Sequence, residues 1–180
     1  MNKYISMLRG INVSGQKKIK MDDLRSLYEE LDFENVVTYI QSGNVVFDSK
    51  IKNTASLKLK IEAAIDEKYK FFVNVIIRTA DEWQKVINNN LFGHIDLENE
   101  SKKYLVTFLS AVPSAKSISE LRQYVTKPDK LVVHNKEVYL YIPNGYGKSK
   151  LSNTFIERKL GVEATTRNWK TVVKLYGLSR

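Results

Sequence analysis

The chain has 180 residues and a formal net charge of +9, and 43% of its residues are hydrophobic, values that fit one or two small globular domains. The absence of cysteine excludes disulfides, thiolate metal sites and cysteine nucleophiles, and two histidines are too few for a histidine-rich metal site. No apolar run is long enough for a signal peptide or a membrane span, so we expect a cytoplasmic protein with no membrane partner.

Residues 1–90 carry the patterns of four strands and three helices. Apolar residues on both faces of the first strand predict that it is covered on both sides. The polar sequence Ser42–Gly43–Asn44 is typical of a β-hairpin turn. Thr79 followed by Glu82 predicts a capping box at the start of the third helix. In chain order we expect a strand over Lys3–Arg9, a helix over Met21–Leu31, a hairpin over Thr38–Asp48, a helix over Asn53–Tyr69, a strand over Phe71–Arg78 and a helix from Thr79.

The second half repeats this order of elements. Gly161 is expected to end the penultimate helix. A local echo supports duplication, because Thr79 precedes Trp83, and Thr165 precedes Trp169, by the same spacing at a strand-to-helix junction. We expect a strand over Lys103–Leu109, a helix over Ser114–Tyr124, a hairpin over Leu131–Ile142, a helix over Leu151–Leu160, a short strand over Val162–Thr165 and a last helix over Arg167–Tyr176.

The repeated order predicts the fold class. We expect an α+β protein of two tandem ferredoxin-like (βαββαβ) units packed together, each with an extra C-terminal helix. The predicted units span residues 1–90 and 102–180, joined by a polar, acidic linker over 91–101.

Positive charge is concentrated in the second half. Residues 1–90 hold 14 Lys/Arg against 12 Asp/Glu, whereas residues 91–180 hold 15 against 8. From Gly145 onward there are eight basic residues and two acidic ones. Such a bias favours a polyanionic partner, and the alternative is a basic surface that only interacts with solvent.

The sequence Gly145–Ser149, GYGKS, resembles a phosphate-binding loop. A Walker A motif would require glycine where Ile142 stands, and it follows a parallel strand rather than a hairpin. A weaker prediction remains, in which Lys148 and Lys150 hold a phosphate group beside a helix start.

Arg167 and Asn168 are expected to open the last helix. The N–H groups of a first helical turn carry partial positive charge, so these two residues could bind an anion there. The alternative is a capped helix, with Thr165 or Thr166 as the cap and Trp169 in the core. His134 is interpreted as a turn or surface residue, and no order of serine, histidine and aspartate stands out as a catalytic triad.

Three stretches resemble a known family: LRGINVSG at Leu8–Gly15, TYIQSGNVVF at Thr38–Phe47 and ATTRNWKTV at Ala164–Val172. Over essentially its whole length the chain resembles the uncharacterised bacterial family "domain of unknown function 1697", although Ser14–Gly15 stands where that family commonly has two glycines. The resemblance implies a cytoplasmic α+β protein of duplicated build, and it carries over no activity, cofactor or catalytic residue. The family's signature positions correspond to Arg9, Gly10, Asn12, Gln41, Ser42, Gly43, Asn44, Thr166, Arg167, Asn168 and Trp169.

These observations predict a binding module for a phosphate-bearing ligand, either a nucleotide or a nucleic acid, at a site between the two halves, with no cofactor and no metal. Ten tyrosines and seven phenylalanines could stack bases on an open sheet, although they alternate as core residues would. The predicted ligand-binding residues are Arg9, Asn12, Gln41, Ser42, Asn44, Lys148, Lys150, Arg167 and Asn168.

Three alternatives stay open. The first is a small-molecule enzyme that uses a polar pocket around Arg9, Asn12, Gln41 and Asn44, although no residue pair there reads as a nucleophile and its base. The second is a protein-interaction domain. In the third, the signature residues bind no ligand and hold the two halves together through buried hydrogen bonds.

Overall fold

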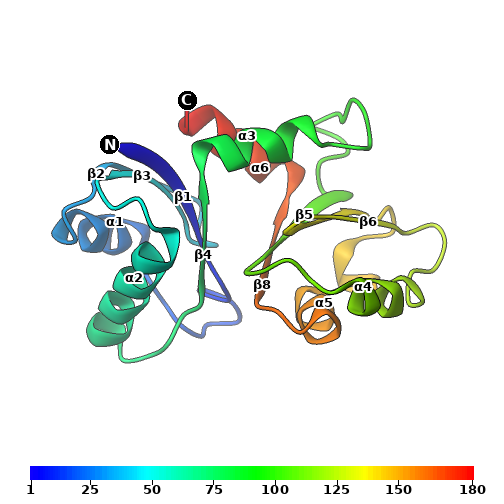
Figure 1. Ribbon diagram of the computed structural model, residues 1–180, viewed down its shortest axis with the longest axis horizontal. Coiled ribbons are helices and arrows are strands. Elements are labelled where there is room, and N and C mark those ends of the chain that lie inside the picture. The colour runs from blue at the N-terminus through cyan, green and yellow to red at the C-terminus, as the bar shows by residue number, and fades with distance from the viewer. The chain divides into compact units, whose positions relative to one another are not determined.

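The computed structural model describes residues 1–180 and contains two four-stranded antiparallel sheets and six helices (Figure 1). Its contacts divide the chain into two compact units. The first unit comprises Met1–Lys85 with Leu175–Arg180, and the second comprises Val86–Lys174. Residues 91–101, predicted to be a linker, lie in the second unit and contain no helix or strand.

The first sheet has the strand order β2-β3-β1-β4, and all neighbouring strands are antiparallel. The predicted capping box at the start of α3 is confirmed, because the Thr79 amide donates to Glu82 Oε2 (2.9 Å) and the Glu82 amide donates to Thr79 Oγ1 (3.1 Å). The elements are β1 (Asn2–Leu8), α1 (Met21–Glu30), β2 (Glu34–Tyr39), β3 (Asn44–Ser49), α2 (Thr54–Tyr69), β4 (Val75–Thr79) and α3 (Ala80–Asn88).

The second sheet has the corresponding order β6-β7-β5-β8, again antiparallel throughout. The two hairpins, β2–β3 and β6–β7, therefore hold equivalent positions in their sheets. The elements are β5 (Tyr104–Leu109), α4 (Ala115–Arg122), β6 (Lys130–His134), β7 (Glu137–Tyr141), the 3-10 helix η1 (Tyr146–Lys148), α5 (Asn153–Leu160), β8 (Ala164–Asn168) and α6 (Trp169–Leu178).

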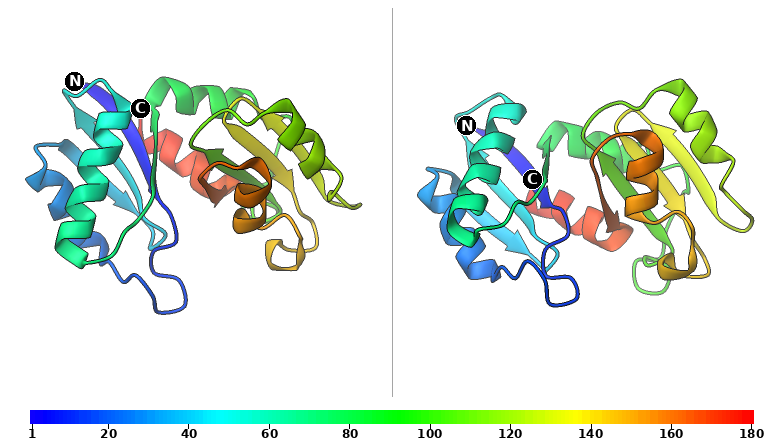
Figure 2. Two further views of the ribbon diagram at one scale, coloured as in Figure 1. Left: turned by 60° about the horizontal axis from the view of Figure 1, so that its bottom comes forward. Right: turned by 90° about the horizontal axis from the view of Figure 1, so that it is seen from below.

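Each helix pair packs on one face of its own sheet, as Figure 2 shows for α1 and α2 and for α4 and α5. In the first unit, side chains that alternate along the strands meet both helices, and an aromatic cluster lies at the centre of this core. The rings of Phe33 and Phe47 stack with centroids 4.6 Å apart, and Tyr28 from α1 meets Phe47 edge-on at 5.3 Å. The alternate residues of β1, Ile5 and Met7, are also fully buried, so the prediction that this strand is covered on both faces is confirmed.

The junction between β8 and α6 differs from the prediction. β8 extends to Asn168, whose partner in β5 is Leu105, so Arg167 lies within the strand rather than at a helix start. The Asn168 side chain accepts a hydrogen bond from the Thr171 amide (2.9 Å) and so caps α6. The counterpart of this cap is Thr79, since each is the last strand residue before its helix. The prediction that Thr79–Trp83 and Thr165–Trp169 are equivalent in the two units is therefore wrong.

Candidate functional site

Asn12 holds the loop after β1 against the turn of the first hairpin. Its side-chain nitrogen donates to the carbonyl oxygens of Ile19 (2.9 Å) and Gln41 (2.8 Å), and its side-chain oxygen accepts from the Ile19 amide (2.9 Å). Asn12 and Gln41 are thus brought together at one end of the sheet, as their positions in the sequence suggest. These bonds serve the loop itself, because they satisfy backbone groups that would otherwise need water.

Ser42, Gly43 and Asn44 close the hairpin turn. The Asn44 side chain is fully buried and donates to the carbonyl of Tyr39 (3.0 Å) and to Ser42 Oγ (3.1 Å). The Gly43 carbonyl accepts from the Leu8 amide (2.8 Å), which joins the turn to the end of β1. The hydrogen bonds of this turn are those of a structural clamp. A ligand-binding role for Ser42 and Asn44 stays a prediction.

A pocket of about 600 Å³ lies beside Asn12 and Gln41 in the first unit. The Tyr69 hydroxyl lies buried against it without a hydrogen-bond partner. Burial raises the pKa of Tyr69, and the negative charges of Asp23 and Glu30 raise it further. Arg9 and Asn44 are not among the lining residues, which are Asn12, Lys18, Ile19, Lys20, Met21, Asp22, Asp23, Gln41 and Tyr69.

Arg167 is buried in β8, where its guanidinium donates to Thr165 Oγ1 (2.8 Å) and to the Thr166 carbonyl (3.0 Å). Burial lowers the pKa of Arg167 to about 10, because the charged form loses its hydration. The expectation that Arg167 and Asn168 present the free N–H groups of a helix start is therefore wrong. Whether Arg167 takes part in ligand binding stays a prediction.

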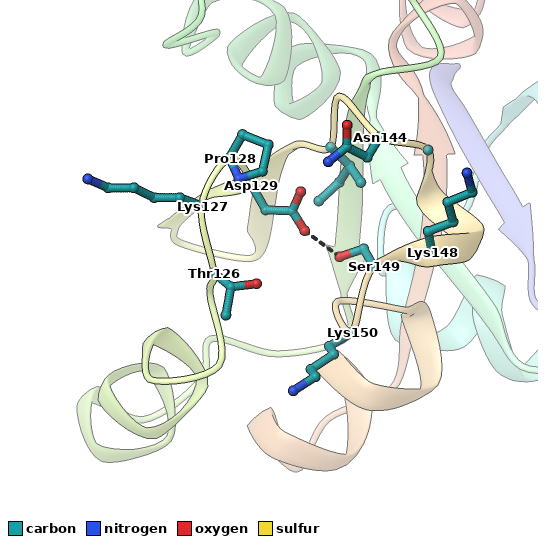
Figure 3. A pocket seen from close by; sticks show the side chains of 10 residues that line it. Thr126, Lys127, Pro128, Asp129, Asn144, Lys148, Ser149 and Lys150 are labelled. Atoms are coloured by element: carbon teal, nitrogen blue, oxygen red, sulfur yellow. Dashed lines mark hydrogen bonds between the residues drawn. The ribbon is translucent and has the colours of Figure 1, made fainter.

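Lys148 and Lys150 line a pocket of about 480 Å³ in the second unit (Figure 3). The loop after α4 forms one wall and contributes Lys127 and Asp129, while the loop after β7 forms the other. Its lining residues are Thr126, Lys127, Pro128, Asp129, Ile142, Asn144, Gly145, Lys148, Ser149 and Lys150. Three lysines and one aspartate give this pocket a formal charge of +2.

The carboxylate of Asp129 in this pocket already accepts a hydrogen bond. Ser149 Oγ donates to Asp129 Oδ2 (2.7 Å) and accepts from the Leu151 amide (3.1 Å), which links the two walls (Figure 3). The amide of Lys148 donates to the Gly145 carbonyl (3.0 Å), and that of Ser149 to the Tyr146 carbonyl (3.2 Å). Since these backbone donors are used within the loop, any anion in the pocket must be met chiefly by lysine side chains. In Figure 3 the three lysines stand around the rim and extend in different directions.

Sequence reasoning found Lys148 and Lys150 but missed Lys127 and Asp129. The signal available was the run Lys127–Pro128–Asp129 before an expected hairpin, which reads only as a turn until the fold brings two loops together.

The first unit has a pocket in the corresponding place, between the loops that follow α1 and β3, of about 600 Å³. Lys60 donates to the Leu31 carbonyl there (2.7 Å), so its charge is directed into the protein. The charged lining residues are Glu29, Asp32, Glu34, Lys50 and Lys60, with a formal sum of −1.

No group of three or more histidine, cysteine, aspartate or glutamate side chains is placed to hold a metal ion. None of the helices combines the length and the hydrophobicity that a membrane span needs.

Comparisons with known proteins place the chain in a family. Residues 1–139 match the family model described as "Protein of unknown function (DUF1697)", and the chain belongs to this family. A solved structure, the conserved bacterial protein SP0830 from Streptococcus pneumoniae, is similar with a TM-score of 0.79 and 22% sequence identity, over 99% of each chain. At this identity the likeness shows the fold alone. No curated protein matches the chain.

Proposed function

We propose that this protein binds a phosphate-bearing ligand, a nucleotide or a nucleic acid, in the lysine-lined pocket of the second unit. The observation that carries the proposal is the charge of that pocket. Lys127, Lys148 and Lys150 surround a single carboxylate, that of Asp129, which already accepts a hydrogen bond from Ser149. The pocket therefore offers positive charge that no neighbouring carboxylate fully neutralises.

Phosphate is the anion that such a pocket suits. A phosphate group carries up to two negative charges, and lysine binds it as a mobile point charge on a long stem. All three lysines are exposed, so each ammonium can turn toward a ligand. The bias of residues 91–180, with 15 basic against 8 acidic side chains, adds a favourable long-range field.

The test is a titration against ADP and against a fluorescein-labelled oligothymidylate at low salt. Two double variants are compared, Lys148→Ala with Lys150→Ala, and Lys50→Ala with Lys52→Ala. The second pair lies in the corresponding loop of the first unit and removes the same charge, so it is the matched control.

We expect the first variant to weaken binding to both probes. For the oligonucleotide, its log–log salt slope should fall by about 1.4, because two phosphate contacts are lost on a single strand. The control should bind as the wild type does. An equal loss of binding in both variants would mean that only net charge matters and would overturn the pocket. The absence of binding by the wild type at low salt would overturn the proposal as well.

A second candidate function is a small-molecule enzyme that uses the pocket beside Asn12 and Gln41. The observation in its favour is the buried Tyr69 hydroxyl, which a ligand could satisfy. A thermal-shift screen of small polar metabolites tests it. A stabilising compound whose effect disappears in Tyr69→Phe would support this candidate, whereas the same shift in both proteins would count against it.

We further infer that each unit follows the ferredoxin-like plan. In that plan the first and third strands are central, and the chain order is βαββαβ. The strand orders β2-β3-β1-β4 and β6-β7-β5-β8 support this inference for both units.

A further inference from the structure

We propose that the face of the second sheet opposite α4 and α5, at its end beside the lysine pocket, is a stacking platform for the bases of a single-stranded nucleic acid. The platform consists of Tyr104, Tyr141 and Phe92. This inference rests on the proposed function and narrows its ligand class from phosphate-bearing ligands in general to an unpaired polynucleotide.

The two tyrosines lie side by side on the central strands. Tyr104 of β5 is the register partner of Tyr141 of β7, and their ring centroids are 4.8 Å apart. Phe92 adds a third ring, 5.3 Å from Tyr104 and 6.3 Å from Tyr141. The next residues along the strands, Leu105 and Leu140, belong to the core under α4 and α5. Because side chains alternate along a strand, the platform lies on the opposite face.

These rings retain exposure that core residues on the same face do not. Phe108 and Tyr139 follow the platform along β5 and β7 and are almost fully buried, and Tyr139 donates to the carbonyl of Val86 (3.1 Å). Tyr104 and Tyr141, by contrast, are only half-buried. Partly exposed aromatic rings on the two central strands of a four-stranded sheet are the surface on which RNA-recognition modules stack bases.

An exposed basic side chain lies beside the platform. Lys130 of β6 is the register partner of Tyr141, and its Nζ lies 5.7 Å from that ring centroid. The nearest carboxylate to Tyr104 along the chain is Glu100, which forms an ion pair with Lys103 (3.5 Å). The combination of stacking rings and exposed lysines is what sequence-tolerant binding to single strands uses.

The platform and the lysine pocket are continuous along the chain. Lys130 directly follows Asp129, and Tyr141 directly precedes Ile142, and both of these neighbours line the pocket. The two features therefore share one end of the sheet, with the phosphate-binding lysines beyond the edge of the stacking face. A flexible strand of several nucleotides can pass around this edge, placing bases on the rings and phosphates in the pocket. A duplex, whose bases are already stacked and paired, cannot do so.

Binding of a labelled oligothymidylate of about twelve nucleotides, the length range of such sites, tests the platform by fluorescence anisotropy. The variant Tyr104→Leu with Tyr141→Leu removes the rings and keeps apolar side chains. The matched control, Tyr104→Phe with Tyr141→Phe, keeps the rings. We expect binding about tenfold weaker or more in the leucine variant and nearly unchanged in the phenylalanine variant. Circular dichroism checks that both variants are folded.

A second experiment uses the wild-type protein alone, so its result does not depend on the folding of any variant. An abasic strand of the same length keeps the phosphates and lacks the bases, and a duplex keeps both but hides the base faces. The wild type should bind both more weakly than it binds oligothymidylate. Equal affinity for the abasic strand and oligothymidylate would overturn the platform.

The outcomes separate this inference from the proposed function. If Lys148→Ala with Lys150→Ala weakens binding to ADP and to the oligonucleotide while the leucine variant binds normally, the proposed pocket is supported and the platform is refuted. If only the leucine variant loses oligonucleotide binding, the platform is supported and the proposed pocket is refuted. If neither variant differs from the wild type, both are wrong.

Discussion

The two units place different chemistry on the same backbone positions. Their strand ends are joined by matching hydrogen bonds, since the Leu8 amide donates to the Gly43 carbonyl (2.8 Å) as the Leu109 amide donates to the Lys136 carbonyl (2.8 Å). Each last strand also carries a buried arginine, Arg78 opposite Ile5 and Arg167 opposite Val106. The two units thus share a strand order, this hydrogen bond and a buried arginine.

The two units differ at the end of each sheet where the hairpin strands begin and end. In the first unit, the residue row across this end has Lys3 paired with Asp48 (3.3 Å), with Glu34 beside them. The same row of the second unit has Tyr104, Tyr141 and Lys130. The adjoining pockets differ as well, because the pocket of the first unit has a formal charge of −1 and that of the second unit has +2.

This contrast indicates what the fold requires and what it leaves free. An ion pair in one unit and two rings in the other both fit the same row, so the rings are not needed to form such a sheet. Their presence beside a basic pocket in the second unit alone is therefore better explained by binding than by folding.

The turn of the first hairpin should show the largest asymmetry. A Cβ on Gly43, at φ +75°, would lie 2.6 Å from Ile11 Cδ1 and 2.9 Å from Leu8 Cβ. Gly43→Ala should therefore cost about 2–4 kcal/mol of unfolding free energy, from backbone strain and overpacking together. Lys136→Ala at the matching position should cost far less. Chemical denaturation measures both losses, and equal losses would contradict the predicted asymmetry between the two turns.

The loop after β1 is the next test, because Gly10–Lys20 is much longer than its counterpart after β5. Asn12→Ala removes three hydrogen bonds and leaves backbone groups of Ile19 and Gln41 unsatisfied, so we expect a loss of about 1–3 kcal/mol. Binding of the oligonucleotide by the second unit should not change. If Asn12→Ala keeps full stability and loses ligand binding, Asn12 belongs to a ligand site rather than to a clamp.

Alkaline pH probes one buried tyrosine in each unit. Burial raises the pKa of Tyr28, partly opposed by its hydrogen bond with Ser6, and burial raises the pKa of Tyr139 with a further contribution from Glu137. A raised folded-state pKa stabilises the fold fully below the ordinary value of 10.0 and loses this contribution as pH rises above it. Unfolding free energy should therefore fall above about pH 10, less steeply in Tyr28→Phe and in Tyr139→Phe. An unchanged slope in either variant would mean that its tyrosine ionises without unfolding.

The smallest effect is expected at the ion pair of the first unit. Lys3 and Asp48 are partly exposed, with 29% and 15% of their side chains accessible, so Lys3→Ala should cost less than about 1 kcal/mol. It should leave oligonucleotide binding unchanged, in contrast to the leucine variant of Tyr104 and Tyr141 in the matching row. Weaker binding in Lys3→Ala would place part of the site in the first unit.

Much of this fold could be predicted from the sequence because periodicity and turn chemistry are local signals. The alternation over Lys3–Arg9, the turn at Ser42–Asn44 and the capping box of Thr79 and Glu82 each depend on a few neighbouring residues. The end of β8 was mispredicted because the two threonines suggested an early cap. Pairing with β5 instead extends the strand to Asn168.

The site was less predictable because its residues meet only through the fold. Lys148 and Lys150 stand out in a glycine-rich loop, but Lys127 joins them from the loop between α4 and β6. Tyr104 and Tyr141 lie on strands that are separated in the chain by helix α4 and strand β6, and either ring alone reads as a core residue. Only the register of β5 against β7 shows that they form one surface.

Amide chemical shifts of the ¹⁵N-labelled protein, recorded while oligothymidylate is added at low salt, test the central claim most directly. At 20.8 kDa, the whole chain can be followed residue by residue in one titration. We predict that the largest changes fall in the loops over residues 124–130 and 141–151 and at Tyr104, with the corresponding loops of the first unit, over residues 30–34 and 49–53, almost unaffected. Changes of equal size in both sets of loops, or changes confined to the first unit, would contradict the account.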